Sequence, residues 1–276
     1  MPELPEVEIT RLGISPFLLD QTITDLVVRH QQLRLAIQPD LRQLCVGKQI
    51  KAISRRAKYL LFDLSEGYLL NHLGMSGHLR IVRQDVAAGK HDHVDFILSN
   101  GKVLRYNDPR RFGLWLYIEK NPEQHPLLAH LGPEPFSREF NPEYLSARAH
   151  SKIQTMKAFI MRNDIVVGVG NIYATESLFY AGIHPLTPAS QTTYDEFAKL
   201  VSSITQVLQQ AINAGGTTLR DFYSAEGKPG YFTNKLQVYG RKNLPCYQCG
   251  TTIETLTIAG RNSAYCPVCQ PKKVRG

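Results

Sequence analysis

Residues 246–269 have the sequence CYQCGTTIETLTIAGRNSAYCPVC and contain four of the five cysteines of the chain, in the spacing C-x2-C-x16-C-x2-C. Each C-x2-C pair presents two sulfurs from one tight turn, and two such pairs at this separation are typical of a tetrahedral zinc site. Four thiolates fill every ligand position, so one zinc ion would be bound here in a structural role. The predicted ligands are Cys246, Cys249, Cys266 and Cys269. Two disulfides are the alternative, which requires an oxidising compartment.

The segment between the two cysteine pairs alternates apolar and polar residues and is interrupted by Ala259-Gly260. This pattern predicts a hairpin of two short strands. Arg261 would then lie at or just after the hairpin tip. A guanidinium whose position is fixed by a metal-stapled hairpin is well suited to bind phosphate, because its planar fork matches two phosphate oxygens. An ordinary exposed arginine is the alternative. The fifth cysteine, Cys45, is predicted to be a small buried residue.

The composition is that of a soluble globular protein with an excess of positive charge. The 276 residues are 43% hydrophobic and 20% charged, with a formal net charge of +8 and a pI of about 9.2. Basic residues gather in two places, residues 51–58 and residues 241–276. Such clusters favour an anionic partner, most often nucleic acid, although a solvated basic face is the alternative. No apolar run is long enough to span a membrane and no secretory leader is present, so we expect a cytoplasmic protein without membrane association.

The hydrophobic pattern changes its period along the chain. Residues 23–118 resemble strands, and the Asn100-Gly101 pair predicts a type I′ hairpin turn. Residues 193–216 contain an apolar stripe with helical spacing, and Gly215 ends the run. The stripe consists of Phe197, Leu200, Val201, Ile204, Leu208 and Ala211. The fold class is therefore α+β. We predict a β-rich N-terminal domain at 1–131, a proline-rich linker at 132–142, a helical domain at 143–235 and a zinc hairpin at 236–276.

A glycine-rich turn, VVGVGN, directly precedes an apolar helical segment. Gly168 and Gly170 would allow close approach of a ligand to the backbone, and Asn171 adds an amide to the free N–H groups of the helix start. This arrangement suits a phosphate. Short glycine turns are common, so a purely structural turn is the alternative.

The first nine residues, MPELPEVEI, combine a stiff start with three glutamates. They predict a helix with Pro5 at its first position and with acidic side chains near the positive end of the helix dipole. They also permit a chemical role. Removal of Met1 would leave Pro2 as a secondary amine beside the carboxyl group of Glu3.

Eight motifs occur together and in order: MPELPEVE, RRAKYLL, HLGMSGHL, NDPRRFG, VVGVGNIYA, GKPGYF, LQVYGR and the four-cysteine finger. This set, which extends over residues 2–270, resembles the bacterial formamidopyrimidine-DNA glycosylase family. The resemblance implies an N-terminal β-sandwich, a C-terminal helix-two-turn-helix domain and a zinc-finger β-hairpin. It also implies a repair enzyme that flips oxidised purines out of damaged double-stranded DNA and excises them.

In the family, the N-terminal proline is the nucleophile, which here is Pro2. Its amine attacks C1′ of the damaged nucleotide, expels the base and forms a Schiff base with the sugar. Glu3 would act as acid and base, which requires a partly buried carboxyl with a raised pKa. Lys58 matches the family's catalytic lysine, which donates a proton during base loss and strand cleavage. Arg261 matches the arginine of the zinc hairpin, which binds phosphate and assists the second elimination of a β,δ-elimination.

Further positions match residues that handle the DNA. Met75, Arg110 and Phe112 match three residues that fill the gap left by the flipped nucleotide, with Arg110 favouring cytosine as the partner base. For Met75 and Phe112, a place in the core is the alternative. Backbone-contacting positions are matched by His91, Lys152 and Asn171. Residues 215–232 resemble a segment that closes over the lesion.

Two other functions stay open. An endonuclease VIII-like enzyme would prefer oxidised pyrimidines, but such enzymes usually begin with PEGPE and lack the DPRRFG region. A zinc-finger DNA-binding protein without catalysis is the second, and the joint presence of Pro2, Glu3 and Lys58 argues against it.

One departure from the family pattern is Asn262-Ser263 after the hairpin arginine, which affects only minor phosphate contacts. We expect a monomeric protein that is associated with the bacterial nucleoid through DNA.

Overall fold

The computed structural model describes residues 2–216 and 235–273. The chain divides into two compact units, one made of residues 1–129 with 214–233 and the other of residues 130–213 with 234–276. Within the described residues, no helix has the length and apolar character that crossing a membrane requires.

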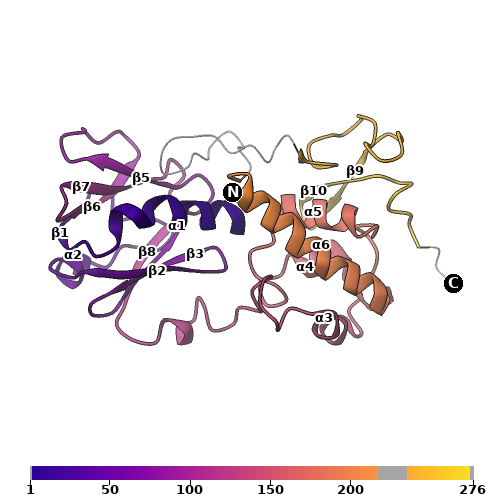
Figure 1. Cartoon of the computed structure of the whole chain (residues 1–276), viewed down its shortest axis with the longest axis horizontal. Helices are drawn as coiled ribbons and strands as arrows, with labels where there is room; N and C mark the ends of the chain where they lie inside the picture. Colours follow the sequence, from indigo (N-terminus) through magenta and orange to yellow (C-terminus); the bar gives the residue numbers. More distant parts are fainter. Residues whose placement is uncertain (1, 217–234, 274–276) are drawn as a thin grey trace. The chain divides into compact units, whose positions relative to one another are not determined.

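The first unit is a sandwich of two antiparallel four-stranded sheets, with strand orders β1-β6-β7-β5 and β2-β3-β4-β8. Helix α1 contacts strands of both sheets (Figure 1). The elements are α1 (Leu4–Leu18), β1 (Ile23–Val28), α2 (Leu41–Cys45), β2 (Ile50–Arg56), β3 (Tyr59–Leu64), β4 (Tyr68–His72), β5 (His78–Arg83), β6 (Asp92–Leu98), β7 (Lys102–Asn107), β8 (Leu114–Ile118) and the 3-10 turn η1 (Pro122–Gln124).

The core of this unit lies between the two sheets. Trp115 on β8 is fully buried, and its ring centroid lies 4.7 Å from that of Phe96 and 5.9 Å from that of Tyr106, both on the opposite sheet. Aromatic rings at these separations add attraction beyond their burial. The predicted β-sandwich is therefore confirmed. Cys45 is fully buried in the same core, as predicted.

The predicted hairpin at Asn100-Gly101 joins β6 to β7, but the predicted turn type was wrong. A type I′ turn needs positive φ at both central residues. Gly101 has φ 74°, whereas Asn100 is not among the residues with positive φ. The N–H of Gly101 donates to the carbonyl of Leu98 at 3.0 Å, which makes a three-residue loop that ends in a left-handed glycine. The side chain of Asn100 accepts from the N–H of Lys102, which stabilises this alternative.

The second unit is helical. Its elements are α3 (Pro142–Ala149), α4 (Met156–Ile160), α5 (Asn171–Tyr180), the 3-10 turn η2 (Ala189–Gln191) and α6 (Tyr194–Asn213), followed by β9 (Glu254–Ile258) and β10 (Arg261–Tyr265). Asn141 is the N-cap residue of α3, and its side chain accepts from the N–H of Tyr144. Helix α6 buries every residue of the predicted apolar stripe except Val201, which is only half buried. Val207, which was not predicted, is also buried. The helix ends two residues before Gly215.

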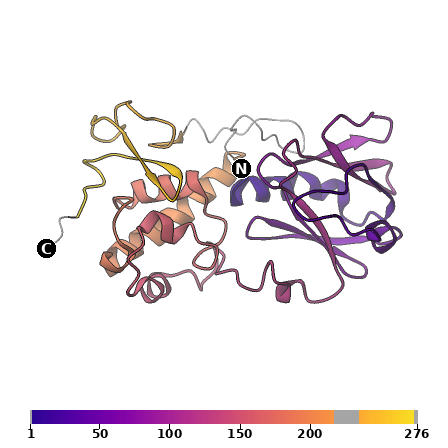
Figure 2. The ribbon, with the colours of Figure 1, turned by 180° about the vertical axis from the view of Figure 1, so that it is seen from behind.

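The zinc hairpin has the predicted form. Strands β9 and β10 pair antiparallel, with Arg261 opposite Ile258. Ala259 and Gly260 form the turn with φ 46° and 71°, so Arg261 follows the tip directly. The hairpin packs its buried residues, among them Ile253 and Ala264, against Phe179 of α5. Figure 2 shows the hairpin, in yellow, beside the helices of this unit.

Candidate functional site

Pro2 and Glu3 are both buried and directly precede α1. Glu3 is the N-cap residue, so α1 begins at Leu4 and the prediction that Pro5 is the first helical residue was wrong by one position. The N–H of Glu3 donates to Oε2 of Glu6 at 2.9 Å, and the Glu3 carboxylate accepts from the backbone N–H of Glu6. This reciprocal pair is a capping box, built with glutamate in place of serine or threonine. It fixes the backbone and the carboxylate of Glu3 beside Pro2.

Lys58 lies half-buried in the turn between β2 and β3. The preceding residue, Ala57, has φ 55°, and its carbonyl accepts from Arg55 at 3.0 Å. Arg55 also forms an ion pair with Glu8 of α1, with an N–O distance of 3.1 Å and both side chains largely buried. The turn that carries Lys58 is thereby fastened to the helix that follows Pro2.

Glu8 has two cationic partners, Arg11 and Arg55. Partial burial of the Glu8 carboxyl acts to raise its pKa, but the two guanidinium groups outweigh that effect and lower the pKa below its usual value. Arg55 belongs to the basic cluster at residues 51–58, which was predicted to favour an anionic partner. Its ion pair with Glu8 shows that its charge is compensated within the protein.

Met75 and Phe112 are 37% and 45% exposed, which excludes the alternative that they are core residues. Met75 lies in the loop between β4 and β5, and Arg110 and Phe112 lie in the loop between β7 and β8. The two loops touch through their backbones, because a Cβ atom added to Gly74 would meet the N atom of Gly113 at 2.5 Å. The structure therefore brings together the three residues that were predicted to fill the gap in the DNA.

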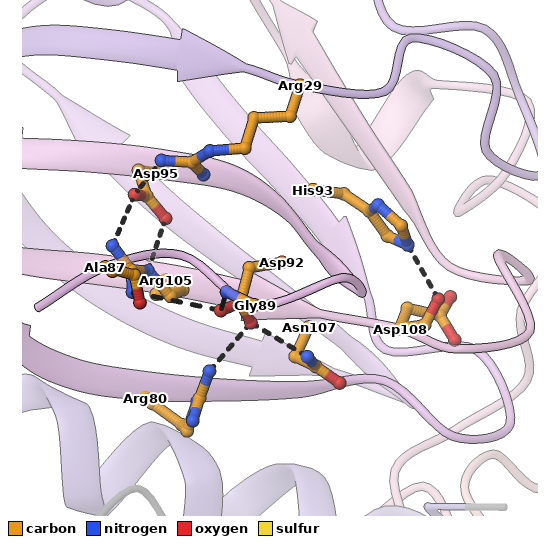
Figure 3. Close-up of polar contacts among 10 residues, drawn as sticks. All are labelled: Arg29, Arg80, Ala87, Gly89, Asp92, His93, Asp95, Arg105, Asn107 and Asp108. Carbon is orange, nitrogen blue, oxygen red and sulfur yellow. Dashed lines mark hydrogen bonds and ion pairs between the residues drawn. The ribbon is translucent and has the colours of Figure 1, made fainter.

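His91 is half-buried, directly before β6, and its carbonyl accepts from the N–H of Asp108 at 3.0 Å. A buried ionic network supports this region (Figure 3). Asp95 and Arg105 form two parallel hydrogen bonds of 2.9 Å between β6 and β7, and Arg29 adds a third contact to Asp95 at 2.6 Å. Sequence reasoning missed this network.

Asp92, the neighbour of His91, is the second carboxylate of the network. It accepts from Arg80 at 2.7 Å, from Asn107 at 2.8 Å and from the N–H of Gly89 at 2.7 Å (Figure 3). Burial acts to raise the pKa of Asp92, but these three donors outweigh it and the pKa is lowered. The segment that leads into His91 is therefore held by a carboxylate that stays ionised.

In the second unit, Lys157 is completely buried in α4. Its Nζ donates to Oδ1 of Asn171 at 2.7 Å, to Oγ of Ser263 at 2.6 Å and to the carbonyl of Asn262 at 3.2 Å. Asn171 is the first residue of α5 and also donates to the Asn262 carbonyl. The structure thus joins the predicted glycine turn to the residue that follows Arg261. A single lysine in an otherwise apolar helical segment was the signal for Lys157 that sequence reasoning passed over.

Lys152 and Arg261 are exposed. Lys152 follows Ser151, which has φ 61°, in the connection between α3 and α4. It lines a recess of about 270 Å³ together with Arg148, His150 and Arg162. The excess of basic side chains makes this recess suitable for an anion. The segment at residues 215–232 was predicted to close over a lesion, and its residues 217–232 lie outside the described part of the chain.

The four cysteines of the hairpin fit a zinc ion. Their sulfur atoms all lie within 4.8 Å of one another. Cys246 and Cys269 are 3.9 Å apart and Cys249 and Cys266 are 3.4 Å apart, measured between Sγ atoms. A tetrahedral site with Zn–S bonds of about 2.3 Å places its sulfurs about 3.8 Å apart, whereas a disulfide needs about 2.05 Å. The donors therefore suit one structural zinc.

Three family models match the chain. The N-terminal domain model of formamidopyrimidine-DNA glycosylase matches residues 1–115, and the H2TH domain model of the same family matches residues 131–223. A zinc finger found in FPG and IleRS matches residues 243–272. The helical unit and the zinc hairpin therefore have the types predicted from sequence.

Curated relatives and solved structures agree with these models. A formamidopyrimidine-DNA glycosylase of Legionella pneumophila is 61% identical over 98% of this chain and 99% of its own. One of Shewanella oneidensis is 50% identical over 99% of this chain and 100% of its own. A Lactococcus lactis FPG mutant bound to DNA containing Fapy-dG superimposes with a TM-score of 0.91 and 34% identity, covering 98% of this chain and 100% of that one. MutM (FPG) of Thermus thermophilus gives a TM-score of 0.86 with 35% identity, covering 99% of this chain and 100% of that one. The chain belongs to the formamidopyrimidine-DNA glycosylase family.

Proposed function

We propose that this protein is a DNA-repair enzyme that excises oxidised purines, 8-oxoguanine and formamidopyrimidines, from damaged double-stranded DNA and then cleaves the strand. Relatives that are 50–61% identical over their full length carry the name of this activity. Related Lactococcus lactis structures contain DNA with Fapy-dG or with an abasic site. Both the lesion and the product of its removal are thus bound by close structural neighbours.

Pro2 is the nucleophile in this proposal. Its secondary amine forms a bond to C1′ of the flipped nucleotide while the bond from C1′ to the base breaks, and the base leaves with a proton. The bond from C1′ to the ring oxygen O4′ then breaks, O4′ gains a proton as the amine loses one, and a charged iminium results. The iminium draws electrons from the opened sugar, so loss of a 2′ proton releases the 3′ phosphate and a second elimination releases the 5′ phosphate. A model α-amine has a pKa of about 7.7–8.0, well below the value of about 10.4 for lysine, so more of it is neutral and reactive near pH 7.

The other predicted residues take the roles that proton transfer and DNA binding require. Glu3 exchanges protons with the sugar and the leaving base, and Lys58 donates a proton during base loss and strand cleavage. Arg261 binds phosphate beside the lesion and assists the second elimination. Met75 and Phe112 fill the gap in the duplex and Arg110 contacts the orphaned cytosine. The phosphate backbone is held by His91, Lys152 and Asn171. The zinc ion fixes the hairpin and takes no part in the reaction.

The single observation that carries the proposal is the position of Pro2. It is buried directly before a glutamate whose backbone and side chain are both fixed by the capping box of α1. A helix start with a purely structural role would not require a buried proline before the N-cap residue.

Borohydride trapping tests the proposal. A duplex with 8-oxoguanine opposite cytosine should give a covalent adduct, and mass spectrometry of its peptides should place the sugar on Pro2. An adduct on a lysine would move the nucleophile elsewhere. No adduct with full DNA affinity would favour a non-catalytic zinc-finger protein, and faster removal of oxidised pyrimidines would favour an endonuclease VIII-like enzyme.

The remaining parts of the proposal concern organisation. We place a β-rich catalytic domain at 1–131, a linker at 132–142, the helix-two-turn-helix domain at 143–235 and the zinc hairpin at 236–276. The enzyme acts as a monomer on DNA in the bacterial cytoplasm. Size-exclusion chromatography with light scattering, with and without lesion DNA, tests the oligomeric state.

A further inference from the structure

Asp108 is a completely buried carboxylate at the end of β7. Four donors converge on its side chain. Oδ1 accepts from Oγ of Ser76 at 2.8 Å and from the N–H of Arg110 at 3.3 Å, and Oδ2 accepts from the hydroxyl of Tyr106 at 2.9 Å and from the N–H of Gly113 at 2.9 Å. All four donors are uncharged, so hydrogen bonds alone compensate the burial of this group.

The backbone of Asp108 extends the same cluster. Its N–H donates to the carbonyl of His91 at 3.0 Å, and its carbonyl accepts from the N–H of Arg111 at 3.2 Å, which closes a turn with Pro109 at the second position. The Asp108 carbonyl also lies 2.8 Å from Nε2 of His93 (Figure 3). Because a carbonyl only accepts, Nε2 of His93 carries the proton of this bond.

Apart from Tyr106 and His93, the partners of Asp108 are residues proposed to contact DNA in this unit or their chain neighbours. Arg110 and His91 are bound directly, Ser76 follows Met75, and Gly113 follows Phe112. We infer that Asp108 is a positioning residue that holds Met75, Arg110, Phe112 and His91 in one arrangement and thereby sets the preference for cytosine opposite the lesion. This inference rests on the proposed function.

The loop between β4 and β5 and the loop between β7 and β8 are packed too tightly around Asp108 to move independently of each other. A Cβ atom at Gly113 would meet the Tyr106 hydroxyl at 1.7 Å, and one at Gly77 would meet the carbonyl of Leu73 at 2.0 Å. Burial, together with the neighbouring charge of Asp108, raises the pKa of Tyr106, which therefore stays a donor. A displacement at Asp108 consequently reaches both loops.

Asp108→Asn is the decisive substitution, because it keeps the size of the side chain and replaces one acceptor with a donor. If the amide faces the Oδ1 position, the N–H of Arg110 loses Asp108 as an acceptor and keeps only Oγ of Ser76, at 3.3 Å. If the amide faces the Oδ2 position, the N–H of Gly113 loses its hydrogen bond to Asp108. In either orientation a backbone group next to a side chain proposed to contact DNA loses a hydrogen bond. Asp85→Asn is the matched control, since Asp85 is exposed in the same unit and pairs with the exposed Arg83.

The experiment measures single-turnover excision of 8-oxoguanine opposite cytosine and opposite adenine, and trapping on a preformed abasic site in single-stranded DNA. For Asp108→Asn we expect the cytosine-to-adenine rate ratio to fall about tenfold or more, because small displacements of a reading residue have effects of this size. Trapping on the single strand should change less than about twofold. Asp85→Asn should match the wild type in both assays.

An unchanged rate ratio in folded Asp108→Asn, or an equal loss in all assays, overturns the inference and assigns Asp108 a purely structural role. If this variant does not fold, Ser76→Ala provides the test, since it removes the hydrogen bonds that Oγ of Ser76, next to Met75, makes with Asp108 and with the N–H of Arg110. Retention of the full ratio in Ser76→Ala would then overturn the inference. Absence of trapping by the wild-type protein would instead contradict the proposed function, so the two failures are distinguishable.

Discussion

The guanidinium of Arg110 lies over the ring of Phe112, with its central carbon 4.8 Å from the ring centroid. Both side chains are exposed, and a cation–π contact of this kind contributes about 0.5–1 kcal/mol at a surface. The residue proposed to read the partner base is therefore already stacked on the residue proposed to enter the duplex. The contact between the two side chains is made within the protein itself and does not depend on DNA.

Arg110→Ala should lower the preference for cytosine over adenine opposite the lesion by about 5- to 150-fold, which corresponds to about 1–3 kcal/mol for a base-reading contact. Competitive excision from the two duplexes measures this ratio. Arg83→Ala is the control, because Arg83 is 74% exposed and takes no part in the proposed site. A ratio that survives in Arg110→Ala would assign base reading to another residue.

Glu6→Ala should weaken the capping box of α1 and release the backbone of Glu3. The expected loss of stability is about 0.5–2 kcal/mol, and adduct formation should slow by about tenfold or more, because the proposed nucleophile and its acid are no longer held in place. Urea unfolding and the rate of borohydride trapping measure the two effects. Glu6→Gln is the matched control, because glutamine also accepts the Glu3 N–H in a capping box. Equal trapping rates for the two variants would contradict the role given to the capping box.

Removal of zinc should unfold the hairpin and leave the first unit intact. The protein has a single tryptophan, Trp115, which is buried in the core of the first unit and reports on that unit alone. On chelation we expect DNA affinity to fall, because Arg261 loses its fixed position, while tryptophan fluorescence stays unchanged. Added zinc should restore binding. A parallel loss of fluorescence and binding would show that the ion stabilises more than its own hairpin.

His72 should make stability depend on pH. Burial, with added effects from the charges of Arg34 and Lys58, lowers the pKa of His72 from 6.5 to about 4, and Nδ1 of its ring accepts from the N–H of Gly74. The folded state thus binds the proton more weakly than the unfolded chain. The resulting stabilisation is fully present above pH 6.5 and is lost as the pH falls through about 4, and it amounts to at most about 3 kcal/mol.

Urea unfolding at pH 7 and pH 4.5 checks this prediction. His72→Asn keeps an acceptor for Gly74 but does not titrate, so its stability should fall less between the two pH values than that of the wild type. All other titrating groups are the same in both proteins and cancel in the comparison. Identical pH dependence of the two proteins would mean that His72 does not destabilise the folded state at low pH.

Local patterns predicted the parts of the structure that depend on neighbouring residues. The spacing of the cysteines predicted the sulfur cluster, and the interruption at Ala259-Gly260 predicted the tip of the hairpin. The period of residues 197–211 predicted α6. In each case the residues that decide the conformation lie within one or two turns of one another.

Contacts between distant segments were not predicted. Asp108 binds Ser76, which lies 32 positions away, and nothing in either motif indicates the other. The pairing of Asp95 with Arg105 was accessible in principle, because a hairpin centred on Asn100 places these two residues opposite each other. It was missed because charged residues in strands are usually expected at the surface. The sequence therefore indicated the residues of the candidate site, and the structure adds the hydrogen bonds and ion pairs that hold them in place.

The sulfur cluster ties this protein to the damage it is proposed to repair. Cys246 with Cys269 and Cys249 with Cys266 are close enough to be converted to two disulfides after modest movement, so metal binding and oxidation compete for the same thiolates. Reactive oxygen species that oxidise guanine also attack thiolates. Oxidative stress would therefore increase the number of lesions and threaten the hairpin that carries Arg261 at the same time. Repair capacity under stress should then depend on how well the supply of zinc keeps this cluster metallated.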